Sequence, residues 1–149
     1  MFDRILIATD GSDPSYEAAK FGVEMARVSG GQVIAVYVVD VHRLAQLPGY
    51  TGFSGMKDRL LDLMNHEGQE ATEEVERMAL KAGVPCTKMV LKGHPSDELI
   101  RYSQESGADL LVMGSVGKSG LNRFLLGSVA EKVVQHSKVP VALVPGRKN

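Results

Sequence analysis

Short apolar runs separated by amphipathic stretches recur along the whole chain, and they predict strands that alternate with helices. The runs that predict strands lie at residues 5–8, 33–39, 85–91, 109–113 and 139–144. The run at 33–39 is apolar and mostly β-branched, so we expect a strand buried on both faces. Such strands are typical of parallel sheets that carry helices on either side.

Between these runs, apolar residues recur at helical spacing and predict four helices. The first predicted helix extends from the turn at Pro14 to residue 29, and the others cover residues 56–82, 96–106 and 128–136. Ser12 and Asp13 are both able to cap the first helix, and the sequence leaves the choice open. Gly68 interrupts the long second helix at a cost of roughly 1 kcal/mol relative to Ala, which predicts a weak point there.

The regular alternation of five strands and four helices predicts the fold class. We expect an α/β domain with an open five-stranded parallel sheet, right-handed crossovers and helices on both faces, in three α/β/α layers. No repeat or linker divides the chain, so one domain is expected over residues 1–149. The glycine-rich stretch at 40–55 is too irregular for a helix and is predicted to be a mobile flap.

Composition and charge narrow the class of protein. Hydrophobic residues make up 44% and charged residues 23% of the chain, which is typical of a packed globular domain. The formal net charge of -1 argues against a nucleic-acid or anionic-membrane partner. The single Cys86 has no partner for a disulfide, and the longest apolar run is too short to span a membrane. With no signal-peptide pattern at the N-terminus, these features predict a cytoplasmic location.

Three glycines and a serine follow the fourth predicted strand, where ligands bind in sheets of this kind. Gly114 and Gly117 lie directly after the strand, and Gly127 and Ser128 open the last helix. Glycines let backbone N–H groups approach a ligand, and a helix N-terminus attracts anions, so the cluster favours phosphate binding. The alternative is that the glycines only permit turns and that Ser128 begins a capping box with Glu131.

The spacing of these glycines shows which of the common phosphate-binding motifs the sequence can contain. The Walker pattern is excluded because Gly117-Lys118-Ser119 lacks its first glycine, and the dinucleotide pattern G-x-G-x-x-G also fails. The spacing G-x2-G-x9-G-S does match, and it resembles the nucleotide-binding motif of the universal stress protein family. The similarity continues in other segments: Thr9-Asp10-Gly11-Ser12, Tyr37-Val38-Val39-Asp40, Gly93-His94-Pro95 and Val139-Pro140-Val141.

The resemblance implies a fold, a ligand and a set of binding residues. The fold would be Rossmann-like and similar to that of adenine nucleotide alpha hydrolases, and the ligand would be ATP, ADP or AMP with Mg²⁺. Asp10 would contact a ribose hydroxyl or a metal-bound phosphate, and the backbone of Val38 would meet the adenine. The full set of implied contacts is Ala8, Thr9, Asp10, Val38, Met113, Gly114, Ser115, Gly117, Gly127, Ser128 and Val129.

The sequence gives weaker indications of catalytic residues and of metal ligands. The sequence offers no dedicated base for hydrolysis, so at most slow ATP hydrolysis is expected. His94 is interpreted as a turn residue in preference to a ligand contact. His66 and Glu70 stand four apart on a helix but lack a third metal ligand nearby, which favours an exposed pair. Cys86 is expected to be a small buried residue without thiolate reactivity.

Three hypotheses of function follow. The first is a cytoplasmic nucleotide-binding regulator or sensor in the stress response, with an unidentified protein partner. The resemblance implies that it forms a homodimer through residues 139–144, the final strand, which would leave an open sheet edge. The second is a phosphotransferase or hydrolase with Asp10 as nucleophile, although Ser12 stands where its second aspartate would be. The third is a dimeric interaction module that needs no nucleotide.

Overall fold

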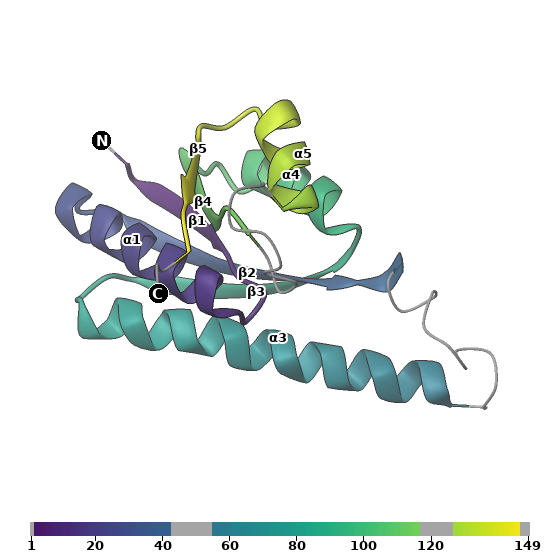
Figure 1. Cartoon of the computed structure of the whole chain (residues 1–149). Helices are drawn as coiled ribbons and strands as arrows, with labels where there is room; N and C mark the ends of the chain where they lie inside the picture. The colour runs from purple at the N-terminus through teal and green to yellow at the C-terminus, as the bar shows by residue number, and fades with distance from the viewer. Residues whose placement is uncertain (1, 43–54, 117–126, 147–149) are drawn as a thin grey trace.

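In the computed structural model, which describes residues 2–42, 55–116 and 127–146, five strands alternate with four helices (Figure 1). The strands are β1 (Arg4–Ala8), β2 (Gln32–Asp40), β3 (Cys86–Gly93), β4 (Leu110–Gly114) and β5 (Val141–Val144). The helices are α1 (Asp13–Ser29), α3 (Met56–Lys81), α4 (Pro95–Glu105) and α5 (Ser128–His136). The predicted flap lies almost entirely outside these described residues.

All pairings in the five-stranded sheet are parallel, in the order β3-β2-β1-β4-β5. β1 lies at the centre, with Leu6 paired to Ile34 of β2 on one side and to Leu111 of β4 on the other. The chain therefore runs outward from β1 to β3 and then returns to the other side of β1. The predicted fold class is confirmed, and strand order reverses between β1 and β4.

Two helices cover each face of the sheet, with α1 and α3 on one side and α4 and α5 on the other (Figure 1). Ile5 and Ile7 of β1 pack toward α1 and α3, whereas Leu6 packs toward α4 and α5. These three side chains are fully buried. This alternation explains why the strand runs are continuously apolar, because each face of the strand meets a helical layer.

Ser12, not Asp13, is the N-cap of α1. Its side chain accepts a hydrogen bond from the backbone N–H of Ser15, and Asp13 is the first helical residue. The helix ends at Gly30, which has a φ of 70°. A left-handed residue at this position is the usual way to close a helix, and glycine adopts it without steric cost.

The predicted weak point at Gly68 is wrong. α3 is continuous over its 26 residues, and Gly68 is buried where the helix crosses β2. A Cβ atom at this position would lie 2.7 Å from Cδ1 of Tyr37 and 3.2 Å from Cγ1 of Val90. The glycine thus lets the helix approach the sheet closely, and its lower helix propensity is offset by packing that sequence spacing alone does not show.

Two strand boundaries differ from the predictions by two residues, and the others by at most one. β3 continues to Gly93, two residues beyond the predicted end, and is paired with β2 as far as Asp40. β5 begins at Val141 instead of at residue 139. Pro140 has no N–H to donate to a strand partner, although its carbonyl accepts a hydrogen bond from Leu111 at 2.9 Å.

No described helix is long and apolar enough to cross a membrane.

We predict that Gly68→Ala lowers the free energy of unfolding by roughly 1–3 kcal/mol, because the added methyl group overpacks the contact with Tyr37. On an open helix surface the same change would stabilise the protein by up to about 1 kcal/mol. Urea denaturation measures the difference. Glu73→Ala, on an exposed position of α3, is the control and should change stability by less than about 0.5 kcal/mol. A stabilised Gly68→Ala protein would contradict the close packing.

Candidate functional site

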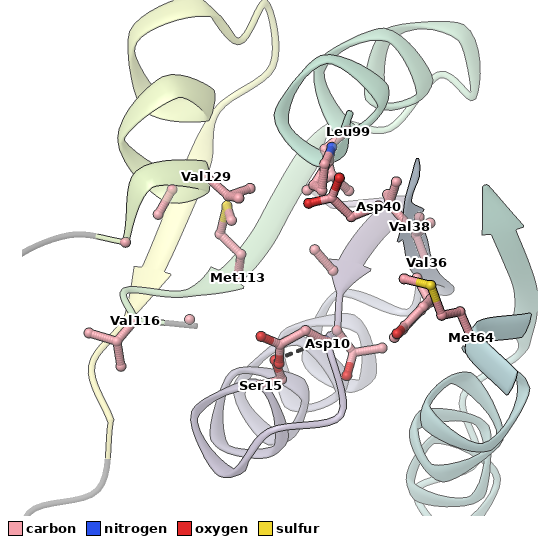
Figure 2. A pocket seen from close by; sticks show the side chains of 17 residues that line it. Asp10, Ser15, Val36, Val38, Asp40, Met64, Leu99, Met113, Val116 and Val129 are labelled. Atoms are coloured by element: carbon pink, nitrogen blue, oxygen red, sulfur yellow. Dashed lines mark hydrogen bonds between the residues drawn. The ribbon is translucent and has the colours of Figure 1, made fainter. Parts of the chain in front are cut away.

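A cavity of about 200 Å³ opens at the carboxyl ends of the strands, where strand order reverses between β1 and β4. Figure 2 shows its walls, which come from the ends of β1, β2 and β4 and from four helices, α1, α3, α4 and α5. The residues that line it are Ala8, Thr9, Asp10, Ser15, Val36, Tyr37, Val38, Asp40, Met64, Pro95, Leu99, Met113, Gly114, Val116, Gly127, Val129 and Ala130. An open parallel sheet binds ligands at this position.

The two ends of the cavity differ in chemistry. At the end formed by β2, α3 and α4, the walls are largely apolar and include Val36, Met64 and Leu99. The one carboxylate among the described lining residues of this end is that of Asp40. At the end beneath β4 and α5, two glycines, Gly114 and Gly127, expose the backbone. One end is therefore suited to a flat apolar group, and the other to a group that hydrogen-bonds to backbone N–H donors.

Asp10 lies between these ends and is held in place by the start of α1. Its Oδ1 accepts hydrogen bonds from the Ser12 N–H at 3.0 Å, the Ser12 hydroxyl and the Ser15 hydroxyl at 2.6 Å. The Asp10 N–H in turn donates to Ser15 Oγ at 3.1 Å, and Figure 2 shows the Asp10–Ser15 contact. Because Ser15 is buried, this network fixes the orientation of the carboxylate.

The N-terminus of α5 has no side-chain cap among the described residues. Gly127 is the N-cap, and its N–H donates to the Ser115 carbonyl at 2.8 Å, which ties the helix to the end of β4. The alternative in which Ser128 caps α5 is wrong, because Ser128 is the first helical residue. The first turn thus keeps backbone donors and the positive end of the helix dipole, the features that bind phosphate.

Gly114 is required by a close backbone approach. A Cβ atom there would lie 3.2 Å from the carbonyl oxygens of both Pro14 and Val116. The glycine lets β4 pass directly beside the first turn of α1. This contact brings the end of β4 next to the loop that carries Asp10, so the two neighbouring strand ends share one cavity.

The structure brings most of the residues implied by the sequence motif to this cavity. Eight of them line it: Ala8, Thr9, Asp10, Val38, Met113, Gly114, Gly127 and Val129. Ser115 and Ser128 are adjacent to lining residues but are not in the cavity wall. Gly117 lies outside the described residues.

Several lining residues have no signal in the motif. Met64 comes from α3 and Leu99 from α4, and only the packing of these helices on the sheet brings them to the cavity. The sequence could have indicated Asp40 as a lining residue, because it lies two positions after Val38 on the same strand and alternate residues of a strand share a face. Val116 is buried, and its side chain closes the wall beside Gly114.

A second hollow, of about 500 Å³, lies on the other side of Asp10 along α3. Four glutamates line most of it: Glu67, Glu70, Glu73 and Glu74. Arg77 is the one basic residue among its described lining residues. An anionic ligand would be repelled by these carboxylates. The cavity between β1 and β4 is therefore the better candidate for a phosphate-containing ligand.

The other candidate residues do not form a site. His66 and Glu70 form an exposed pair, with Nε2 and Oε1 2.9 Å apart, as the sequence predicts. No cluster of three or more potential metal-ligating side chains is present in the described part of the chain. His94 is the N-cap residue of α4, and its ring packs edge-to-face against His42, with centroids 5.5 Å apart. Neither ring belongs to the cavity wall.

Cys86 is half-buried at the start of β3. Burial, reinforced by the negative charge of Glu76, raises the pKa of its thiol from 9.0 to about 11. The backbone at Ala35 and the Lys88 ammonium act in the opposite direction but do not compensate. The expected absence of thiolate reactivity is thus supported by a physical cause.

Comparisons with known proteins agree on one family. The model of the Universal stress protein family matches residues 1–145. Universal stress protein MJ0531 of Methanocaldococcus jannaschii is 42% identical over 144 residues, which cover 97% of this chain and 82% of that protein.

Solved structures show the same relationship. The hypothetical protein MJ0577, of the same organism, matches with a TM-score of 0.84 at 27% identity, over 100% of this chain and 99% of its own. A universal stress protein in complex with cAMP matches with a TM-score of 0.68 at 28% identity, over 98% of each chain.

We predict that iodoacetamide at pH 8 alkylates Cys86 at least roughly tenfold more slowly in the native protein than in the urea-unfolded chain. The rise of the thiol pKa from 9.0 to about 11 reduces the thiolate fraction at pH 8 about a hundredfold, and the greater nucleophilicity of a more basic thiolate offsets roughly tenfold of this. The native rate should keep rising with pH up to about 11, where the folded thiol titrates. Equal rates in the two states would contradict the assigned environment of Cys86.

Proposed function

This chain belongs to the universal stress protein family, and from this premise we propose that it binds an adenine nucleotide in the cavity between β1 and β4. ATP is the expected ligand, with ADP and AMP as alternatives. The complex of a family relative with cAMP supports an adenine nucleotide as the class of ligand. We expect the chain to act as a cytoplasmic regulator or sensor in the stress response.

The observation that carries this proposal is the uncapped N-terminus of α5 beside the glycine backbone of β4. Gly127 and Gly114 line the same cavity end, and no described side chain occupies the capping position of the helix. The phosphates would bind at this end, where N–H groups and the helix dipole attract negative charge. The sugar and base would extend toward β2 and α4, where the walls are apolar.

Mg²⁺ is expected to enter with the nucleotide. Asp10 lies beside the proposed phosphate end and offers one oriented carboxylate. A protein cage for the ion is not found among the described residues, but Mg²⁺ is commonly held by substrate phosphates, water and one or two carboxylates. Asp10 therefore fits as a single protein ligand, and the ion would offset part of the phosphate charge.

We expect at most slow hydrolysis from this site. Phosphoryl transfer needs a group that positions the attacking water and a cation that stabilises the transferring group. Asp10 and Asp40 are the titratable groups among the described lining residues, apart from the phenol of Tyr37. Oδ1 of Asp10 is already engaged by Ser12 and Ser15. This arrangement favours a binding role over that of a nucleophile or base.

A homodimer through the final strand is the second part of the proposal. β5 is the end strand of the described sheet, and its four apolar residues remain partly exposed. The Pro140 carbonyl accepts a hydrogen bond from Leu111 of β4, and the Val144 carbonyl accepts one from Ser115, directly after β4. The alternate residues Val141 and Leu143 therefore turn their N–H and C=O groups outward. A second copy of β5 would satisfy these groups and cover the apolar side chains.

We predict that titration with Mg-ATP in a calorimeter gives a dissociation constant on the order of micromolar for the native protein. Gly127→Asp should reduce affinity by at least roughly tenfold, because it places a carboxylate among the phosphates. Gly127→Ala is the matched control for added bulk. Its backbone φ of -61° suits any residue, so binding by this variant should be reduced much less. Equal binding by the native protein and Gly127→Asp would contradict this phosphate site.

We predict a solution mass of about 32 kDa by light scattering at micromolar concentration, twice the 16.1 kDa of one chain. Leu143→Pro removes an outward N–H of β5 and should shift the mass toward that of the single chain. Leu143→Val retains that N–H and an apolar side chain, and should leave the dimer intact. A native mass of one chain would exclude the dimer.

A further inference from the structure

We propose that Asp40 selects the base of the bound nucleotide by accepting a hydrogen bond from an exocyclic amino group. This inference rests on the proposed function, since it assigns specificity within the same cavity. Asp40 is outside the glycine motif and reaches the cavity from the end of β2.

The position of Asp40 assigns it to the base end of the ligand. The glycine backbone and the N-terminus of α5 lie on the β4 side of β1, whereas β2 and α4 lie on its other side. A nucleotide whose phosphates lie at Gly127 would thus have its base beneath α4. Figure 2 shows the Asp40 carboxylate directed into the cavity below Leu99, with Val38 beside it.

The fold fixes where this carboxylate lies. Asp40 is the last residue of β2 and is paired in register with Gly93 at the end of β3. Gly93 has a φ of 147° and leads directly into α4, whose Pro95 and Leu99 form the facing wall. The carboxylate is therefore attached to a rigid strand end, which gives better positional control than a loop.

Asp40 is the one acidic group among the described residues of this end. Val36, Val38, Met64 and Leu99 supply apolar surface for the faces of a base. The other carboxylate of the cavity, Asp10, lies just before α1, beside the glycine end. Asp40 is therefore the acidic side chain whose position along the cavity matches the edge of the base.

A carboxylate can discriminate between bases because it accepts hydrogen bonds and does not donate them. Adenine presents an amino group at the position where hypoxanthine and guanine present a carbonyl oxygen. The amino group would donate to Asp40, whereas a carbonyl oxygen would face a like partial charge. In a largely apolar pocket such a mismatch is costly, because the unpaired polar groups lose their hydrogen bonds to water.

The test compares ATP with ITP, which differ by an amino or oxo group on the base, in calorimetric titrations of full-length protein. Native protein should bind ATP roughly ten- to hundredfold more tightly than ITP. In the Asp40→Asn variant the affinities for ATP and ITP should differ by no more than about threefold, because an amide both donates and accepts hydrogen bonds. Asp97→Asn is the matched control. Asp97 lies in the first turn of α4, with a side chain 68% exposed, outside the cavity wall, and this variant should keep the native ratio.

The ratio separates specificity from stability, because a variant that is merely damaged loses affinity for both nucleotides. A native protein that binds ATP and ITP equally, or an Asp40→Asn variant that retains the native preference, would overturn this inference and leave the nucleotide site intact. Absence of binding by both nucleotides to the native protein would overturn the proposed function, and the role of Asp40 with it.

Discussion

Burial of β1 on both faces is the constraint on which the other features depend. Ile5, Leu6 and Ile7 have no exposed surface, so helical layers must cover each side of the sheet. The chain forms one half of the sheet on one side of β1 and the other half on the opposite side. The connections that leave β1 and β4 therefore diverge. Their separation leaves the cavity, which is a consequence of topology and does not depend on any single side chain.

The sequence predicts this framework well because local patterns encode it. Continuous apolar runs identify strands that are covered twice, and capping residues and glycines mark helix ends. Glycine spacing also leads to the cavity end formed by Gly114 and Gly127. What the spacing does not encode is which helix crosses which strand. Gly68 is thus misread as a defect when it is a contact point, and the contributions of Met64 and Leu99 are not detected.

Local hydrogen bonding decides the remaining differences. Ser12 and Asp13 are equivalent as caps in a propensity table, but Ser12 also donates to the Asp10 carboxylate and so serves both helix and loop. Ser128 matches a capping box, yet Gly127 occupies the cap position and bonds back to Ser115. In both cases the outcome depends on a partner that lies outside the helix, which a pattern within one helix does not contain.

The hydrogen bond from Gly127 to Ser115, at 2.8 Å, joins two points that are twelve positions apart in the sequence. Both partners of this bond are backbone groups, so a substitution of the Ser115 side chain does not remove it. The position of the α5 N-terminus beside the end of β4 is therefore a property of the path of the chain, and it can persist while the side chains around it change.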